Sequence, residues 1–462
     1  MSKSLPFISM LLAALLAADA VAAWYWPFGP SKPDPPKKPE VPSTGRFINR
    51  VQDPKDKIYP KQPDHSGVSV DKVKQLADDG NPNAQVTLGK IYFDGLVGEK
   101  QDFRKAFKYF QMAAENGNPE GMYNLAVCYE GGFGVLKADM AKALKWYEAS
   151  AEAGVSMGQR KAAAFAEAHG KADIAFKYYK MLADDKDVDC MYHVAVCMLN
   201  GYGTNVDAPG AVKYLLQAAE IGHTRSQVRL ADCYQQGTGV QRDYGEMANW
   251  LMVAAHTGDP EAQAKLGMCY QTGRGVTKNL ELAFKWYQAG AEADFVDALY
   301  LLGACYRDGI GTDKNDKKAL EYYKRAADQG DSLSQMEVAE AYRNGRGVVA
   351  DTEEALAWYR KAAENGLGIA QARLGALLAS GTEKTPANPS EGEKWLQKAL
   401  EGRQPLAVVQ VALCYLNGDG VPIDRERARR ILVDAAARGS REAQSIYELY
   451  FLNTSSSSEE QK

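Results

Sequence analysis

Cysteine is the residue type whose spacing in this chain first suggests chemistry. Six of the seven cysteines occupy one slot of a recurring pattern, directly before a tyrosine or a methionine: Cys128, Cys197, Cys233, Cys269, Cys305 and Cys414. Helices that carry equivalent slots pack roughly 10 Å apart, whereas a disulfide needs Cα atoms within about 7 Å. Cys190 and Cys197 are separated by about 10.5 Å of helical rise, which is also too far. We therefore expect small buried apolar side chains rather than disulfides.

A serine near the start of the patterned region is the second chemical candidate. Ser69-Val70-Asp71-Lys72 matches the S-x-x-K string of penicillin-recognising serine enzymes, but the accompanying S-D-N and K-T-G strings are missing. Ser69 as a helix N-cap, with Asp71 in the first turn, explains the string fully. An exported hydrolase acting on a β-lactam or cell-wall substrate is therefore kept as the alternative function.

The histidines and the charge balance argue against other kinds of site. The five histidines form no H-E-x-x-H string and there is no C-x-x-C string, so we expect no metal and no other cofactor. His223 and His256 lie near predicted hairpin ends, and we expect both to be solvated. The net charge is only −4 and no basic stripe is present, so a nucleic-acid partner is not expected.

These residues are placed by a unit of 36 residues that repeats along the chain. Four copies follow one another without insertion between Arg225 and Gly366. One aromatic residue per copy recurs at the same interval: Trp250, Trp286, Tyr322 and Trp358. A fixed period of this length is typical of stacked repeat architectures, in which each unit packs only against its neighbours.

The copy from residue 261 to 296 shows which local structure one unit predicts. Ala262 and Leu266 are spaced to lie on one face of an α-helix. Gly273 ends that helix, since glycine tolerates the positive φ needed just past a helix terminus. A second apolar helical face, which includes Trp286, follows the turn. Each unit is therefore predicted to be two antiparallel helices joined by a glycine-rich turn.

Small residues recur where the two helices of a unit must touch. One slot of the first helix holds only alanine or glycine: Ala126, Ala195, Ala231, Gly267, Gly303, Ala339, Gly375 and Ala412. Such a slot lets helix axes approach to near the lower end of the roughly 8–10 Å range. We expect the recurring Trp or Tyr of the second helix to be buried over the neighbouring pair, which stabilises the stack by roughly 2–3 kcal/mol per ring.

The recurring string A-x-x-x-L-G-x-x-Y-x-x-G-x-G-V, then K-A-x-x-W-Y-x-x-A-A-x-x-G, resembles the Sel1-like repeat family, a relative of the tetratricopeptide repeat. One copy carries it at Ala262, Leu266, Gly267, Tyr270, Gly273, Gly275, Val276, Ala283, Trp286, Tyr287 and Ala291. The resemblance covers most of residues 69–452. It implies an all-α fold, a right-handed α-solenoid of about ten two-helix repeats with capping half-repeats at both ends. The ten units are expected to start near Asn83, Glu120, Gly158, Asp189, Arg225, Glu261, Asp297, Leu333, Ile369 and Leu406.

The first 22 residues are interpreted as an export signal. Lys3 supplies a positive start, the apolar run covers residues 5–18, and Ala20-Val21-Ala22 is an A-x-A cleavage site. We expect cleavage, hence an exported protein in the periplasm, cell envelope or medium with no membrane span afterwards. A retained membrane anchor is the alternative, because aromatic residues, which favour membrane interfaces, follow at once.

The rest of the chain is expected to contain three further segments. Residues 23–68 are proline-rich and predict a disordered linker, residues 69–452 form the repeat solenoid, and residues 453–462 predict a disordered tail. Two copies depart from the pattern. The third, residues 158–188, lacks the glycine-rich turn and predicts a tighter hairpin, and the ninth has a longer, proline-rich and exposed loop at residues 381–389.

A column of variable first-helix positions is the candidate partner surface. Positions one before the recurring leucine, two after it and six after it lie on one side of the helix. In tetratricopeptide-like arrays the first helices line the concave groove, so the resemblance implies a protein or peptide partner on this side. The column comprises Arg229, Asp232, Gln236, Lys265, Met268, Thr272, Leu301, Ala304, Asp308, Glu337, Glu340 and Asn344. We predict a non-catalytic interaction scaffold of the bacterial cell envelope, and a merely solvated face is the alternative.

Overall fold

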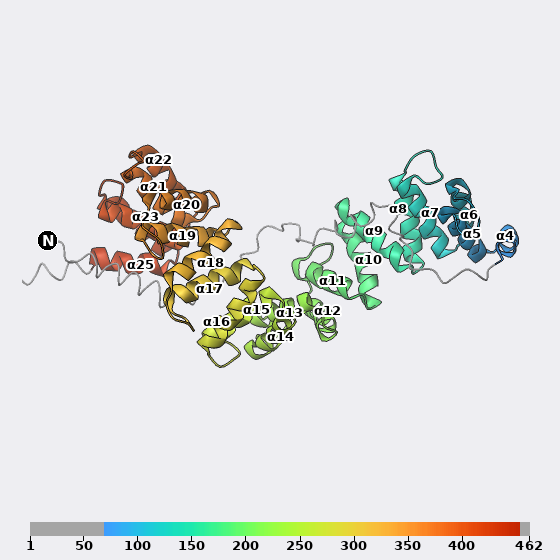
Figure 1. Ribbon diagram of the computed structural model, residues 1–462, viewed down its shortest axis with the longest axis horizontal. Helices are drawn as coiled ribbons and strands as arrows, with labels where there is room; N and C mark the ends of the chain where they lie inside the picture. The colour runs from blue at the N-terminus through green and yellow to red at the C-terminus, as the bar shows by residue number, and fades with distance from the viewer. Residues whose placement is uncertain (1–68, 453–462) are drawn as a thin grey trace, which may run out of the picture. The chain divides into compact units, whose positions relative to one another are not determined.

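The computed structural model of the protein describes residues 69–452 (Figure 1). These residues form 22 α-helices and one π-helical turn, and there is no strand among them. No described helix is both long enough and apolar enough to cross a membrane. The predicted signal at 1–22, the linker at 23–68 and the tail at 453–462 lie outside the described residues, so their predictions stay predictions.

The chain divides into two compact units between Asp243 and Tyr244, and each unit is a stack of helical hairpins. Unit 1 contains α4 (Val70–Asp78), α5 (Pro82–Asp94), α6 (Phe103–Glu115), α7 (Pro119–Gly131), α8 (Met140–Glu152), α9 (Ser156–Ala168), α10 (Ala172–Asp184), α11 (Val188–Asn200), α12 (Ala208–Glu220) and α13 (Thr224–Gln236). Unit 2 contains α14 (Tyr244–His256), α15 (Pro260–Thr272), α16 (Leu280–Glu292), α17 (Val296–Asp308), α18 (Asp316–Asp328), α19 (Ser332–Asn344), α20 (Thr352–Glu364), α21 (Gly368–Ser380), α22 (Pro389–Glu401), α23 (Pro405–Asn417), α24 (Arg425–Ala437), α25 (Arg441–Tyr447) and the π-helical turn η2 (Glu448–Leu452).

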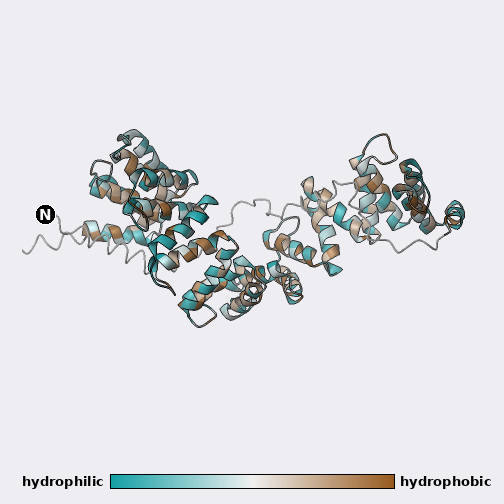
Figure 2. Cartoon of the chain, viewed as in Figure 1, coloured by the Kyte–Doolittle hydropathy of each residue, from teal (hydrophilic) through white to brown (hydrophobic). Residues whose placement is uncertain are grey.

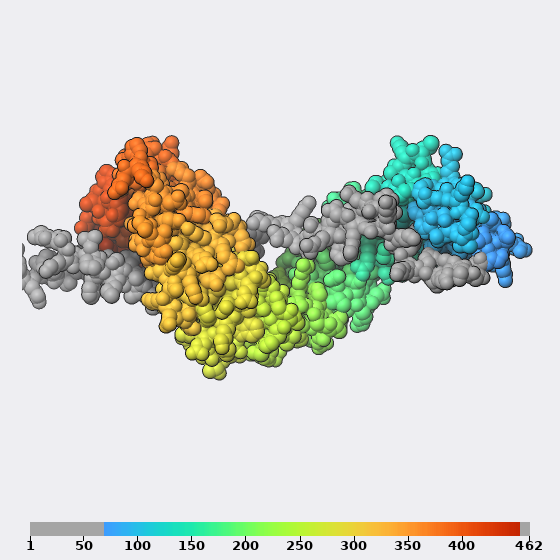
Figure 3. All heavy atoms as spheres, viewed as in Figure 1, coloured from blue at the N-terminus to red at the C-terminus, as the bar shows by residue number. Residues whose placement is uncertain are grey.

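The predicted repeat organisation is confirmed. Each of the ten predicted first helices, from α5 to α23, begins one or two residues before its expected start, and α4 and α25 are the terminal half-repeats. In unit 2 the helices pack in sequence order, which Figure 3 shows as bands of colour that border their neighbours along the chain. The protein is thus an all-α solenoid. The boundary between α13 and α14 was not expected, because the 36-residue period continues across it.

Capping residues and glycines fix the ends of many of the helices, as α15 shows. In α15 the Asp259 side chain accepts a hydrogen bond from the Ala262 backbone N–H at 2.8 Å, and Gly273 closes the other end with φ 76°. Gly275 follows with φ 73°, and a Cβ atom there would lie 1.8 Å from the carbonyl oxygen of Tyr244. The turn between α15 and α16 therefore presses directly on the start of α14.

The small slot of the first helix receives an aromatic ring from the second helix. A Cβ atom at Gly267 would lie 2.5 Å from the ring of Tyr287, which is fully buried. Trp286, one residue earlier, is only half-buried, as are Trp250, Tyr322 and Trp358. We expected the rings of these four residues to be the buried ones, and this expectation is wrong. Consecutive residues point about 100° apart on a helix, so only one of two adjacent aromatic side chains faces the hairpin partner.

Recurring glutamines, all but Gln263 buried, also connect neighbouring helices, and this contact was not predicted from the sequence. The side-chain amide of Gln335 in α19 donates a hydrogen bond to the backbone carbonyl of Ala327 in α18 at 3.2 Å. The same bond recurs, at 3.1–3.3 Å, from Gln85, Gln159, Gln227, Gln263 and Gln371. Around these bonds the hydrophobic residues form bands along the helices, which Figure 2 shows in brown between teal surfaces.

The two irregular copies differ as the sequence predicted, with one addition. Only residues 169–171 separate α9 from α10, so that hairpin is tight. The loop between α21 and α22 is mostly exposed, yet it is organised around one carboxylate. Glu353 accepts hydrogen bonds from the hydroxyls of Thr382 and Thr385 and from the Lys384 backbone N–H. These bonds, the Thr382 bond first, hold the pKa of Glu353 below its usual value.

Candidate functional site

The residues that first suggested chemistry occupy structural positions. All seven cysteines are buried and free, as expected, and burial raises the pKa of Cys269 to about 12 and that of Cys414 to about 11. These thiols are therefore protonated and unreactive near neutral pH. The Ser69 hydroxyl accepts from the Lys72 backbone N–H at 3.5 Å, which is the N-cap geometry predicted from the sequence.

Histidines and acidic side chains do not assemble a metal centre. Within residues 69–452 no group of three or more His, Cys, Asp or Glu side chains could hold an ion. His256 is exposed, as predicted, but His223 is half-buried, with Nδ1 2.8 Å from the Ser226 hydroxyl and Nε2 3.6 Å from Asp189. Burial lowers the pKa of His223, so the expectation that it is solvated is wrong.

The predicted partner column is divided between the two units. Arg229, Asp232 and Gln236 lie on α13 in unit 1, whereas all the other members lie in unit 2. Arg229 and Asp232 are half-buried, 4.0 Å apart as an i,i+3 ion pair, and Gln236 is exposed. We therefore treat the unit 2 members as a separate candidate surface.

Four members of the column in unit 2 are buried, which corrects the prediction. Lys265 is 2% exposed, Met268 3%, Leu301 2% and Ala304 2%. Helix α15 packs against α14 and α16, and it also contacts α17, so a third side of the helix is covered. A helical wheel drawn for one helix cannot include that third contact. Lys265 is accommodated by an ion pair with Glu261 at 2.8 Å.

The remaining members on α15, α17 and α19 are exposed or half-buried. Thr272 is exposed and its hydroxyl donates to the Met268 carbonyl at 2.8 Å. Asp308 is exposed beside Arg307, whose guanidinium also donates to Glu337 at 2.7 Å. The structure therefore brings Glu337 of α19 together with Arg307 of α17. Further polar contacts on α19 surround Glu340.

Glu340 is the centre of a polar network on α19. It accepts hydrogen bonds from the Tyr359 hydroxyl at 2.6 Å and from the Asn344 amide at 3.0 Å, and Nε of Arg373 lies 3.6 Å away. Burial alone would raise the pKa of Glu340, but the charge of Arg373 and the Tyr359 hydrogen bond hold it below its usual value. Glu340 is therefore ionised at neutral pH and orients both partners.

Beside this network lies a pocket of about 130 Å³ between α19, α21 and α23. Its polar lining is formed by two arginines, one carboxylate and three uncharged side chains: Arg343, Arg373, Asp419, Tyr359, Ser380 and Gln410. Nε of Arg373 is buried and makes no hydrogen bond to the described residues. The pocket thus offers guanidinium donors to an incoming acceptor.

None of these pocket residues belongs to the predicted column. Arg373 lies 36 residues after Glu337, and Gln410 lies 37 residues after Arg373. Both therefore occupy the same repeat position as Glu337, one before the recurring leucine slot. Extending the column by two more repeats would have included them. Arg343 and Tyr359 are not on the column, and only the packing of α20 against α19 and α21 reveals them.

The sequence model of the Sel1 repeat matches nine segments: residues 82–118, 119–155, 188–223, 224–252, 260–295, 296–331, 332–367, 368–402 and 405–440. The chain belongs to the Sel1 repeat family. The gap between the second and third of these Sel1 matches, residues 156–187, coincides with α9, α10 and their short turn. The nine matched repeats and this unmatched pair account for the ten predicted repeats.

Solved Sel1 structures resemble the chain over much of its length. The chain is similar to c5321, a protective antigen present in uropathogenic Escherichia coli strains that displays an SLR fold. The two are 30% identical over 84% of this chain and 83% of that chain, and the TM-score is 0.60. It is also similar to a Sel1 repeat protein from Oxalobacter formigenes, with 27% identity, 52% and 96% covered, and a TM-score of 0.48. No curated protein matches the chain. Sel1 and related repeat proteins generally mediate protein–protein interactions, and the solenoid is typically non-catalytic.

Proposed function

We propose that this Sel1 protein is a non-catalytic scaffold that binds a peptide segment of a protein partner along the first helices of unit 2. The observation that carries the proposal is the pocket between α19, α21 and α23, where two guanidinium groups face an open volume of about 130 Å³. That volume suits one side chain of a partner rather than a whole small-molecule substrate, since ligand pockets usually measure roughly 300–1,000 Å³.

The chemistry of the pocket favours an acidic anchor residue on the partner. Arginine presents a planar array of donors that matches a carboxylate, and such pairs are among the stronger protein contacts. Nε of Arg373 is buried and lies 3.6 Å from Glu340, so an incoming carboxylate would contact the other N–H donors of the two guanidinium groups that line the pocket. Asp419 on the wall and Glu340 beside the pocket balance the charges of Arg343 and Arg373, so the preference for a carboxylate rests on these donors and not on a net positive charge.

Peptide selection on the full-length protein tests this site. Random peptides displayed on phage are selected against the wild type, and the affinity of the recovered peptides is then measured by calorimetry. We expect recovered sequences to share an Asp or Glu whose replacement by Asn or Gln weakens binding about tenfold, as does Arg373→Gln. Lys285→Gln, an exposed change on α16, serves as the control and should leave affinity unchanged. Peptides that bind Arg373→Gln as tightly as the wild type would contradict the proposal.

We also propose that the scaffold works outside the cytoplasm, in the bacterial cell envelope. The support is the signal-like sequence of residues 1–22, together with a similar protein that is a protective antigen of uropathogenic E. coli. Mass measurement of the protein expressed in a bacterial host, with its native N-terminus, tests this proposal. A mature chain that starts at Ala23 supports export with cleavage, and a chain that keeps residues 1–22 contradicts cleavage and favours the anchor.

A further inference from the structure

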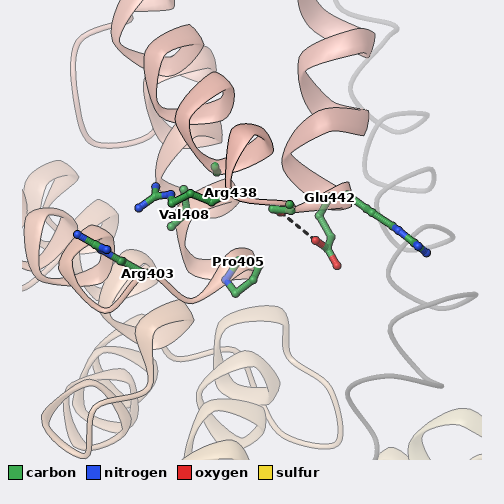
Figure 4. Close-up of a pocket in the computed structure, with 9 residues that line it drawn as sticks. Arg403, Pro405, Val408, Arg438 and Glu442 are labelled. Atoms are coloured by element: carbon green, nitrogen blue, oxygen red, sulfur yellow. Dashed lines mark hydrogen bonds between the residues drawn. The ribbon is translucent and has the colours of Figure 1, made fainter. Parts of the chain in front are cut away.

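A second cleft lies far along the chain from the Glu340 network, where the turns after α22 and α24 meet the starts of α23 and α25. Its volume is about 350 Å³. Pro405, Val408 and Ala435 give it an apolar wall, and the other residues that line it are Arg403, Arg438, Gly439, Ser440, Arg441 and Glu442. Figure 4 shows the side chains of Arg403 and Arg438 extending toward the same side of the cleft, away from Glu442.

The charged groups of this cleft differ in how far they are already paired. Glu442 accepts a hydrogen bond from the Ser440 hydroxyl at 2.9 Å, and Arg438 forms an ion pair with Asp434 on its own helix. The Arg403 side chain is exposed and has neither a hydrogen bond nor an ion pair with any of residues 69–452. Arg441, which also lines the cleft, is likewise exposed and without a hydrogen bond or ion pair to these residues. The cleft therefore has two guanidinium groups free to bind an external group, and Arg438 extends to the same side as one of them, Arg403 (Figure 4).

The backbone of Arg403 has a conformation that favours glycine. Its φ is +53°, in the left-handed region, and the equivalent turn positions of neighbouring repeats are glycines, as at Gly330, Gly366 and Gly439. A residue other than glycine costs roughly 1 kcal/mol there. Asp294 occupies the same kind of position with φ +54°, but its side chain binds Arg325 of the next hairpin. The side chain of Asp294 therefore has a partner within the protein. Arg403 has none among residues 69–452, and the same is true of Lys186, which is exposed at the equivalent turn with φ +70°.

We propose that this cleft is a binding site for a phosphate monoester, with the phosphate between Arg403 and Arg438. Guanidinium groups bind phosphate through paired N–H donors, and two of them match a dianion. A phosphate alone leaves most of the cleft empty. The apolar wall of Pro405, Val408 and Ala435 accommodates the organic part of the ester.

Calorimetric titration of the full-length protein tests the site with inorganic phosphate, phenyl phosphate and vesicles that contain phosphatidic acid. We expect phenyl phosphate to bind more tightly than inorganic phosphate, because only the ester uses the apolar wall. Vesicle binding that depends on Arg403 identifies a lipid source of the group, and its absence together with phenyl phosphate binding identifies a small-molecule source. Failure of all three probes to bind at millimolar concentration overturns the proposal.

The strained backbone supplies a variant that separates binding from folding. Arg403→Gly and Arg403→Asn remove the guanidinium but suit a positive φ, so both should keep or raise the melting temperature while affinity for phenyl phosphate falls about tenfold. Arg430→Gln, an exposed change on α24 outside the cleft, is the matched control. Equal loss of affinity in Arg430→Gln would show adventitious charge attraction only, and unchanged affinity in Arg403→Gly would refute the site.

Discussion

Replacing Glu340 by glutamine tests whether the network on α19 works as the structure indicates. Glutamine keeps the shape of the side chain and can still accept from Tyr359, but it removes the negative charge that faces Arg373. The side chain of Glu340 is only 14% exposed, so solvent screens the lost charge weakly. We expect the fold of unit 2 to become less stable and the pocket beside it to become more positive.

The size of the stability effect follows from the contacts. A hydrogen bond to a charged group contributes about 1.5–3 kcal/mol, against about 1 kcal/mol for a neutral pair. Converting the Tyr359 bond from charged to neutral therefore costs about 1 kcal/mol, and the ion pair with Arg373 adds about 1 kcal/mol. A total of about 2 kcal/mol lowers the melting temperature of a 150–250-residue unit by roughly 4–8 °C.

Thermal unfolding at pH 7 measures this change, and hydrogen exchange shows whether it is centred on α19 and α21. Because folding lowers the pKa of Glu340 from its ordinary value of 4.5, its contribution is present above pH 4.5 and is lost as the pH falls through the lower folded-state pKa. The Gln variant should not show this part of the loss of folding stability at acidic pH. Glu364→Gln, exposed on α20, is the control. A Gln variant as stable as the wild type at pH 7 would refute the reasoning.

Three further changes test the repeat architecture. Gly275→Ala should destabilise unit 2 by about 1–3 kcal/mol more than Gly258→Ala in chemical unfolding. Both glycines have positive φ, but only a Cβ at Gly275 meets the Tyr244 carbonyl, and overpacking adds this cost to the backbone strain. Equal costs would contradict the stacking contact. Gln335→Ala should cost about 0.5–1.5 kcal/mol, since it removes one buried hydrogen bond while the Ala327 carbonyl still accepts from the Gly330 backbone N–H, and an unchanged unfolding midpoint would contradict this. The seven thiols should react with a thiol reagent only under denaturing conditions, and rapid labelling of the native protein would show that they are not buried.

The helices were predictable because stacking requires every hairpin to repeat the same contacts. A small residue such as Gly267 must face an aromatic ring, and glycine must follow the first helix, so both recur at the repeat interval. The period did not show whether Trp286 or Tyr287 is the buried ring, because both recur together. That choice depends on how the helix is rotated against its partner, which spacing alone leaves open.

The candidate surface was less predictable because exposure depends on more than one helix. Lys265 and Glu337 occupy equivalent positions, yet Lys265 is buried whereas Glu337 contacts Arg307 at a partly open site. The close contact of α15 with α17 accounts for the burial of Lys265. Whether two such non-consecutive helices touch depends on the local curvature of the stack. The side chains of the column vary from repeat to repeat, so their pattern does not reveal this contact.

A repeat protein offers an internal comparison for every position, and that comparison distinguishes structural departures from functional ones. Asp294 replaces a turn glycine at an energetic cost, but its ion pair with Arg325 ties it to the next hairpin and explains its presence through stability. Arg403 and Lys186 have the same kind of backbone, and neither side chain has a hydrogen bond or ion pair with residues 69–452, so strain alone does not identify a binding residue. Arg403 in addition lines a cleft together with Arg438 and the apolar wall of Pro405, Val408 and Ala435. The proposed phosphate site therefore rests on this cleft, and the positive φ at Arg403 supplies the variants that test it.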